Sequence, residues 1–236
     1  MNNMKKILAL VMTAVLCLGL LGPACAANNS PEYNAVALME ITFKCGCSWT
    51  GMGTMVAENA LLTASHNLVC YKHGSENKSV RFYFGYKGRN KYFYRYTGDF
   101  NYTYYEDFLN GYRSEDDIAF VIFPTSIGKK TGWYATRYES DEALKWEYSH
   151  VIGMKSNSIV DDWNQIDVLS SREISWPLSP SFRGAATGGP VYWTGEGLKY
   201  PTLIAVHTTA SDSTGYARRL TKDVFDNMKK HGARFN

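Results

Sequence analysis

Short runs of apolar or alternating residues cover most of the chain after position 34. Alternation with period two is typical of a strand with one buried face, and a short continuous apolar run is typical of a strand buried on both faces. The predicted strands are 35–43, 53–56, 60–64, 81–86, 91–96, 117–123, 148–154, 190–193 and 202–207. Glu58-Asn59 and Gly88-Arg89-Asn90 separate two pairs of runs, which predicts hairpins there.

Only the C-terminal segment, 221–231, has helical spacing. Its apolar residues on one face are Val224, Phe225 and Met228, and Gly232 is a typical stop signal after the last turn. The segment 124–140 is polar and unpatterned, and we expect it to connect two halves of the chain. Many short strands followed by one helix predict paired β-barrels or a β-sandwich.

The first 26 residues have the pattern of a signal peptide. Lys5 and Lys6 precede 15 apolar residues, 7–21, and Ala24-Cys25-Ala26 places small residues where a signal peptidase cleaves. Fifteen residues are short for a bilayer, which takes about 20. We therefore expect a secreted, extracellular protein that begins near position 27.

A lipoprotein anchor at Cys25 is an alternative to simple cleavage. Gly22 stands where a lipobox usually has Leu, which argues against the anchor. We expect no membrane contact after the leader is removed.

The composition is that of one ordinary globular domain or two small ones. Of the 236 residues 45% are hydrophobic and 20% charged, and the formal charge is only +3 before the two leader lysines are lost. So weak a charge gives no reason to expect a nucleic-acid partner. We expect a monomer.

Three cysteines remain after the leader, Cys45, Cys47 and Cys70. In an oxidising compartment two of them are expected to pair, and Cys47 with Cys70 is the most plausible disulfide. Closing that loop would stabilise the fold by about 3 kcal/mol. The C-x-C and C-x-x-H spacings would also allow a zinc site with His73, but they match no strong zinc signature.

The segment 82–112 is rich in aromatic residues, with 14 Phe or Tyr in 31 positions. Twisted hairpins with cross-strand Tyr pairs would explain this enrichment. The alternative is an exposed aromatic platform for a sugar, a cell-wall polymer or a protein partner.

Three short segments carry candidate chemistry. His66 ends the apolar run 61–66, Asp117 opens the buried run 117–123, and Thr187 begins a glycine-rich turn, Thr187-Gly188-Gly189-Pro190. Together they offer a base, a carboxylate to orient it and a hydroxyl on a tight turn, in the chain order of the chymotrypsin triad.

These segments resemble those of trypsin-like serine proteases. The stretch from Gly53 to His66 is similar to their "GTGFLV…LTAAH" segment, 117–119 to "DIA", and 187–191 to the "SGGPV" around the nucleophile. The tail, 204–209 and 215–225, resembles the end of secreted bacterial glutamyl endopeptidases. The likeness covers roughly 40–230, although 71–116 matches poorly.

The resemblance implies an all-β, chymotrypsin-like fold of two six-stranded antiparallel β-barrels with a C-terminal α-helix. Barrel one would span about 33–123, the connection 124–140, barrel two 141–220 and the helix 221–231. The implied activity is that of a secreted endopeptidase of the serine type, with a peptide or protein substrate in the cleft between the barrels. It needs no metal and no organic cofactor.

The resemblance also implies catalytic roles. Thr187 would attack the peptide carbonyl, His66 would act as general base and acid, and Asp117 would hold the imidazole. The N–H groups of Ala185 and Thr187 would form the oxyanion hole.

In glutamyl endopeptidases a His at the position of His207 binds the acidic side chain. His207 and the adjacent Thr208 are therefore candidate substrate-binding residues, although His207 could equally be a core residue at a strand end. Phe182 stands on the pocket wall where that branch has a small hydroxyl residue, so its ring would fill space that a glutamate needs. His73, His150 and His231 match no motif, and we expect structural or surface roles for them.

Three departures lie in one catalytic turn. Thr187 replaces Ser and adds a methyl group that restricts χ1. Ala185 replaces Gly in the oxyanion hole, and Ala186 cannot accept an N-terminal ammonium as Asp would. These changes motivate an alternative: a weak or inactive pseudoprotease that uses the scaffold as a binding module.

Overall fold

The computed structural model describes residues 31–105, 107–155, 158–178, 187–194, 198 and 200–235. The leader and three positions singled out above, Phe182, Ala185 and Ala186, lie outside the described residues. Predictions that fall on them stay predictions.

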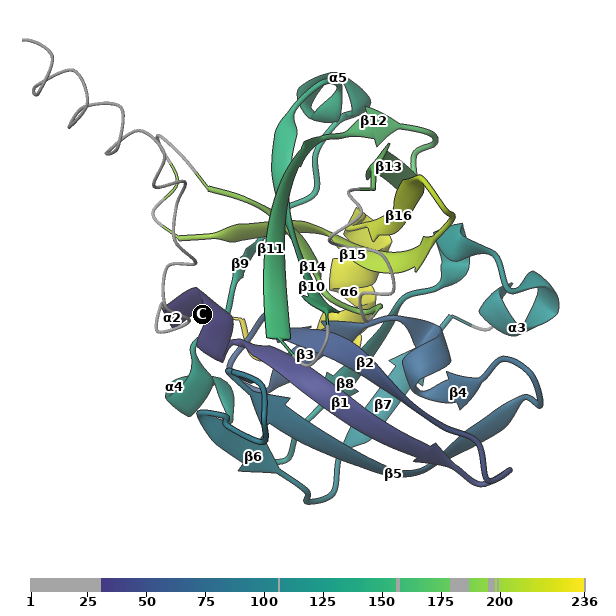
Figure 1. Cartoon of the computed structure of the whole chain (residues 1–236), viewed down its shortest axis with the longest axis vertical. Coiled ribbons are helices and arrows are strands. Elements are labelled where there is room, and N and C mark those ends of the chain that lie inside the picture. Colours follow the sequence, from purple (N-terminus) through teal and green to yellow (C-terminus); the bar gives the residue numbers. More distant parts are fainter. Residues whose placement is uncertain are drawn as a thin grey trace, which may run out of the picture. The chain divides into compact units, whose positions relative to one another are not determined.

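Among the described residues eight strands form the first sheet, and all of their pairings are antiparallel (Figure 1). They are β1 (Val36–Phe43), β2 (Ser48–Met55), β3 (Ala60–Thr63), β4 (Val69–Cys70), β5 (Ser75–Phe84), β6 (Tyr94–Tyr96), β7 (Asn101–Tyr104) and β8 (Ala119–Ile122). Their order is β4-β5-β1-β2-β3-β8-β7, and β6 pairs with β5. Strand β5 thus borders both β1 and β4, which are far apart in sequence.

In the described part of the chain, another eight strands form the second sheet. They are β9 (Ala135–Thr136), β10 (Tyr148–Lys155), β11 (Ser158–Gln165), β12 (Asp167–Val168), β13 (Glu173–Pro177), β14 (Pro190–Trp193), β15 (Thr202–Ala210) and β16 (Thr214–Arg219). Their order is β11-β10-β14-β15-β16-β13-β12, and β9 is the one described strand that pairs in parallel, with β15.

The helices are short except at the C-terminus. They are α2 (Pro31–Asn34), the 3-10 turn η1 (Ser65–Asn67), α3 (Asp107–Gly111), the 3-10 turn η2 (Ser114–Asp116), α4 (Gly128–Thr131), α5 (Asp141–Leu144) and α6 (Lys222–Lys230). Val224 and Met228 of α6 are buried in the core of the first sheet. In the described part of the chain no helix is long and apolar enough to cross a membrane.

Two curled antiparallel sheets and a C-terminal helix confirm the predicted chymotrypsin-like architecture. Among the described residues each sheet has eight strands rather than six, because short pairings extend the hairpins. Strands β4, β9 and β12 have only two residues each, too few to recognise by alternation.

Core packing explains much of the aromatic enrichment in 82–112. Phe82 and Phe84 are fully buried, and the Phe82 ring meets Phe123 edge-on at 5.2 Å. Tyr96 meets the same Phe123 ring at 5.0 Å. Edge-to-face pairs of this kind stabilise by about 0.5–1.5 kcal/mol beyond area burial. The segment therefore builds the core of the first sheet, although Phe93 is 53% exposed.

Replacing Phe82 with Ala should lower the free energy of unfolding by about 3–5 kcal/mol, because it removes a buried ring and leaves a cavity. The matched control is Phe93→Ala, expected to change stability by no more than about 0.5 kcal/mol. Urea unfolding followed by tryptophan fluorescence measures both. Similar losses in the two variants would contradict the packing described here.

Candidate active site

His66 stands on the 3-10 turn η1, directly after β3. Its neighbours Ser65 and Asn67 are fully buried, whereas the His66 side chain keeps 17% exposure. Ser65 Oγ donates a hydrogen bond of 2.8 Å to the carbonyl of Ile118. This bond ties the His66 turn to the segment that carries Asp117.

Asp117 lies between η2 and β8 and is 4% exposed. Its Oδ1 accepts the backbone N–H of His66 at 3.0 Å, and its Oδ2 lies 2.7 Å from His66 Nδ1. A carboxylate only accepts hydrogen bonds, so Nδ1 of the imidazole carries the proton. Nε2 of neutral His66 is then free of hydrogen and can accept a proton.

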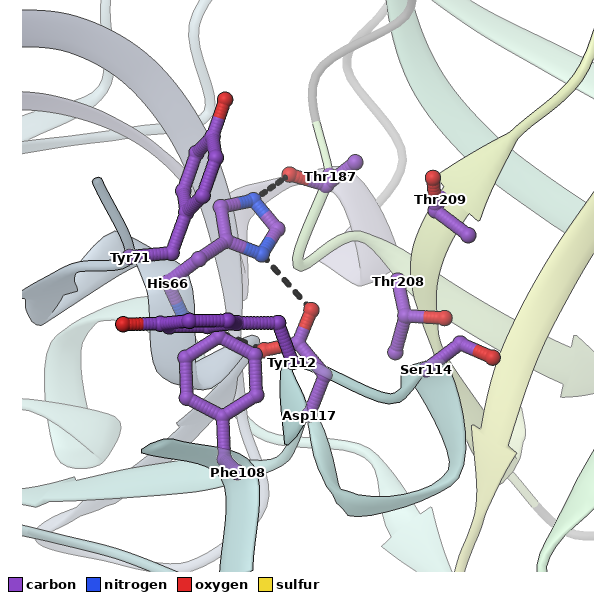
Figure 2. A pocket seen from close by; sticks show the side chains of 9 residues that line it. All are labelled: His66, Tyr71, Phe108, Tyr112, Ser114, Asp117, Thr187, Thr208 and Thr209. Carbon is purple, nitrogen blue, oxygen red and sulfur yellow. Dashed lines mark hydrogen bonds and ion pairs between the residues drawn. The ribbon is translucent and has the colours of Figure 1, made fainter. Parts of the chain in front are cut away.

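Thr187 approaches from the second sheet, on the turn before β14. Its Oγ1 is hydrogen-bonded to His66 Nε2 (Figure 2). The structure therefore brings together the carboxylate, imidazole and hydroxyl that the sequence singled out. The three groups meet where the two sheets face each other.

Backbone and amide hydrogen bonds hold the Thr187 turn against both sheets. The Thr187 carbonyl accepts from the N–H of Met52 at 2.7 Å and from Asn67 Nδ2 at 3.0 Å, both in the first sheet's half. On the other side, the Gly188 N–H donates to the His207 carbonyl at 2.7 Å, and the His207 N–H donates to the Gly189 carbonyl at 2.9 Å.

The turn requires glycine at position 188. Gly188 has φ +92°, a left-handed conformation that side chains strongly disfavour, and a Cβ there would lie 2.0 Å from the Met52 carbonyl oxygen. The glycine thus allows the Thr187 turn to approach β2 closely.

Two supporting residues, Asn67 and Asp116, were missed from the sequence. Asn67 bonds Thr63 Oγ1 as well as the Thr187 carbonyl, each at 3.0 Å. Asp116 is 2% exposed and pairs with Arg113 at 2.6 Å and Arg172 at 3.0 Å, which anchors η2 beside Asp117. The sequence signal that could have identified them is their position: each is a polar residue directly next to a catalytic candidate, Asn67 after His66 and Asp116 before Asp117.

A cavity of about 340 Å³ opens beside the imidazole. Its lining residues are His66, Tyr71, Phe108, Tyr112, Ser114, Asp117, Thr187, Thr208 and Thr209. Figure 2 shows the aromatic rings of this lining on the side of the first sheet and the threonines on the side of the second. The aromatic rings thus form a largely apolar wall next to the imidazole and the hydroxyl.

His207 is 1% exposed and does not line this cavity, whereas the neighbouring Thr208 does. Its ring packs edge-on against Trp176 at 5.3 Å, and its Nε2 donates to the Thr209 carbonyl at 3.1 Å. Burial lowers the pKa of His207 to about 4. The ring is therefore neutral near pH 7, with its proton on Nε2.

The described cysteines are all free thiols, so the structure does not contain the expected Cys47–Cys70 disulfide. Cys47 Sγ and Cys70 Sγ each lie 3.5 Å from His73 Nδ1, so the three side chains approach one another closely.

Comparison with known proteins supports the fold assignment. The structure matches a Glu endopeptidase in complex with MPD, with TM-score 0.70 and 16% identity over 88% of this chain and 94% of that one. It also matches a thermostable serine protease, AL20, from an extremophilic microorganism (TM-score 0.69, 12% identity, 86% and 98% coverage). The protease Anisep from Arthrobacter nicotinovorans matches at TM-score 0.70 and 13% identity, covering 85% and 96%.

At the level of sequence, the chain is 26% identical over 214 residues to an extracellular metalloprotease of Bacillus subtilis. That match covers 86% of this chain and 65% of the relative, so the chain spans less than two thirds of the relative's length. No family model matches the sequence. The chain therefore has the chymotrypsin-like fold found in these serine proteases.

The buried neutral His207 should make stability depend on pH. In the unfolded chain its pKa returns to about 6.5, so the unfolded state takes up a proton between about pH 6.5 and 4 while the folded state does not. Stability is therefore lost as the pH falls. From pH 7 to 4.5 this one group should account for about 2–3 kcal/mol.

Urea unfolding at the two pH values measures this contribution. The His207→Gln variant keeps an amide donor but cannot be protonated, so its loss of stability between pH 7 and 4.5 should be smaller by that amount. Equal losses in the two proteins would contradict the low pKa of His207.

Proposed function

We propose that this chain is an endopeptidase that hydrolyses peptide bonds by acyl transfer, with Thr187 as nucleophile. The observation that carries the proposal is the continuous hydrogen-bond chain from Asp117 through His66 to the Thr187 hydroxyl. This is the arrangement by which a weakly nucleophilic alcohol is activated by an adjacent base.

In the proposed reaction, Thr187 Oγ1 attacks the carbonyl carbon of the substrate while its proton passes to His66 Nε2. Asp117 stabilises the imidazolium that forms. The protonated His66 then gives the proton to the leaving amine, which leaves an acyl ester on Thr187. Water, deprotonated by His66, hydrolyses the ester and restores the hydroxyl.

The oxyanion that forms in the first step needs N–H donors. We propose the backbone N–H groups of Ala185 and Thr187, in line with the resemblance.

The extra methyl of threonine should slow the reaction without preventing it. A β-branched side chain is stiff at χ1, and misplacing a reacting atom by about 1 Å can cost around 10²-fold in rate. The Thr187 hydroxyl is nevertheless hydrogen-bonded to His66 Nε2, so the methyl group does not turn it away from the base.

The same geometry favours this mechanism over two others. A binding module has no chemical need for an oriented carboxylate–imidazole–hydroxyl chain. A metallopeptidase holds its metal ion with about three side-chain ligands, and among the described residues the cavity lining offers one imidazole and one carboxylate, already bonded to each other.

For substrate preference we propose an uncharged side chain. Acidic preference would follow from the glutamyl endopeptidase resemblance through His207, with Thr208 beside it. However, the pKa of about 4 keeps His207 neutral, and its Nε2–H is already donated to the Thr209 carbonyl. A neutral imidazole whose N–H is already donated has no positive charge with which to attract the carboxylate of a substrate.

We further propose that the protein is exported and acts outside the cell. The pattern of residues 1–26 supports export, and the Bacillus subtilis relative is itself named as extracellular.

Replacing His66 with Ala should abolish cleavage of a mixed peptide library, with kcat at least about 10³-fold lower, because removing a triad base costs up to about 10⁶-fold. Thr187→Ser should raise the hydrolysis rate of the best substrate at least about tenfold by removing the methyl. His231→Ala, an exposed histidine on α6's C-terminal side, is the matched control and should leave the rate unchanged. Cleavage that persists in His66→Ala would contradict the mechanism.

Paired peptides that differ only in Glu or Gln before the cleaved bond test the preference. We expect kcat/KM values that agree within about threefold, because His207 supplies no charge to tell the two apart. A preference of more than about tenfold for Glu would mean that His207 becomes protonated in the complex, against the proposal.

A further inference from the structure

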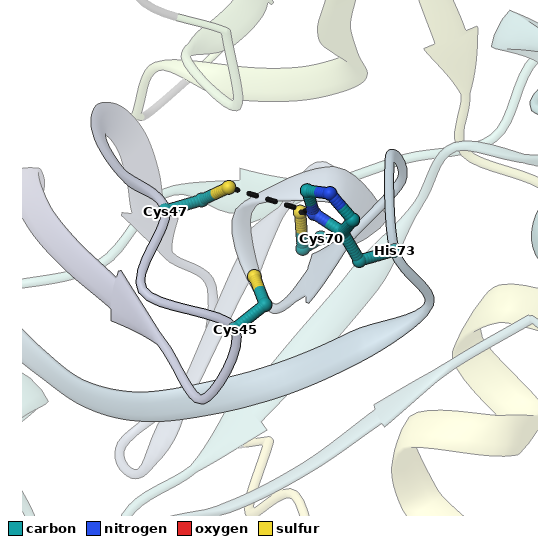
Figure 3. A group of neighbouring side chains, drawn as sticks. All are labelled: Cys45, Cys47, Cys70 and His73. Atoms are coloured by element: carbon teal, nitrogen blue, oxygen red, sulfur yellow. Dashed lines mark hydrogen bonds between the residues drawn. The ribbon is translucent and has the colours of Figure 1, made fainter.

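A cluster of four metal-ligating side chains lies outside the candidate active site. Cys45, Cys47, Cys70 and His73 each offer one ligand atom, and these four atoms lie within 4.8 Å of one another (Figure 3). We propose that this cluster binds one Zn²⁺ ion through three thiolates and the Nδ1 atom of His73. The site is separate from the candidate active site and does not depend on peptidase activity.

Two of the distances between ligand atoms match the edges of a tetrahedral zinc site. With Zn–S bonds of about 2.3 Å and a Zn–N bond of about 2.05 Å, an S···N edge of the tetrahedron is about 3.6 Å long. Cys47 Sγ and Cys70 Sγ both lie 3.5 Å from His73 Nδ1. A disulfide would instead need two sulfurs about 2.05 Å apart and would use only two of the four groups.

Two adjacent turns present the ligands. Residues 44–47 join β1 to β2 and carry Cys45 and Cys47, while β4 and the turn 71–74 carry Cys70 and His73. Strand β5 pairs with both β1 and β4, so the backbone holds the two turns side by side. The cluster is therefore built by sheet pairing, and does not depend on a chance approach of exposed loops.

Local hydrogen bonds shape each turn. The Phe43 N–H donates to the Cys47 carbonyl at 2.9 Å, and the His73 N–H donates to the Cys70 carbonyl at 3.2 Å. The Cys45 N–H donates to Ser75 Oγ at 3.0 Å, which links the first turn to the second. Each turn also contains a glycine with a positive φ angle, Gly46 at +89° and Gly74 at +58°. These angles let the backbone reverse its direction sharply next to a ligand in both turns.

The donor set points to zinc in a structural role. Thiolates and imidazole are the ligands that Zn²⁺ prefers, and four protein ligands close the coordination shell with no position left for a reacting water. The ion would fix the turn that begins at Tyr71, a residue whose ring lines the cavity beside His66. It would thus stabilise one wall of the candidate active site.

Zinc binding is tested on the full chain, purified anaerobically, incubated with an excess of Zn²⁺ and freed of unbound metal by gel filtration. We expect about one zinc per chain by mass spectrometry of the metal. His73→Ala and Cys45→Ser should each reduce this at least about tenfold, since loss of one ligand opens the shell. The matched control His231→Ala should keep the full stoichiometry.

Less than about 0.2 zinc per chain in the parent protein, or equal zinc in the parent and in His73→Ala, would overturn the proposal. Co²⁺ binding to the parent protein keeps the test decisive if the variants do not fold. Visible absorption of tetrahedral cobalt with thiolate charge transfer supports the site, and its absence counts against it.

Thiol mapping separates zinc from a disulfide. The protein is denatured in EDTA and iodoacetamide without reductant, and its peptides are analysed by mass spectrometry. Alkylation of Cys45, Cys47 and Cys70 is the expected result, because a zinc site keeps all three as thiolates. Recovery of a peptide cross-linked between Cys47 and Cys70 would overturn the proposal.

Discussion

The geometry of the candidate site depends on one carbonyl group, that of Thr187. It belongs to the second sheet's half of the chain, and both of its described donors, the Met52 N–H and Asn67 Nδ2, belong to the first. Met52 and Asn67 are fully buried, so leaving either donor without an acceptor would cost about 1–3 kcal/mol. This shared acceptor aligns the two sheets at the point where the hydroxyl must meet the imidazole.

Further hydrogen bonds around Thr187 hold the other residues of the site in place. Asp117 accepts hydrogen bonds from both the backbone and the ring of His66, and rotation of the ring would break its bonds to Asp117 and to Thr187. The backbone of His207 holds the far side of the Thr187 turn. Positions set by main-chain bonds need little rearrangement when a substrate arrives, which is what a preorganised site requires.

The sequence predicted the strands with clear apolar patterns and the residues that meet in the site, but little of what supports them. The apolar run at 117–123 correctly predicted strand β8, because all four residues of that strand are buried and therefore apolar. The burial of His207 depends on Trp176 in β13, a strand that showed no clear alternation. The gathering of Cys45 and Cys47 with Cys70 and His73 depends on β5 pairing with the distant strand β1 as well as with its neighbour β4. Spacing along a chain carries no information of that kind, because only the completed sheet decides which turns are neighbours.

The separation of 121 positions between His66 and Thr187 has a consequence during synthesis. A nascent polypeptide that ends before position 187 already contains the imidazole and the carboxylate, but it has neither the alcohol nor the carbonyl that Met52 and Asn67 bond. Under the proposed mechanism such a fragment has no nucleophile, whatever structure its first half has reached. The ribosome must therefore have added residue 187, nearly four fifths of the way along this sequence, before the proposed hydrolysis is possible.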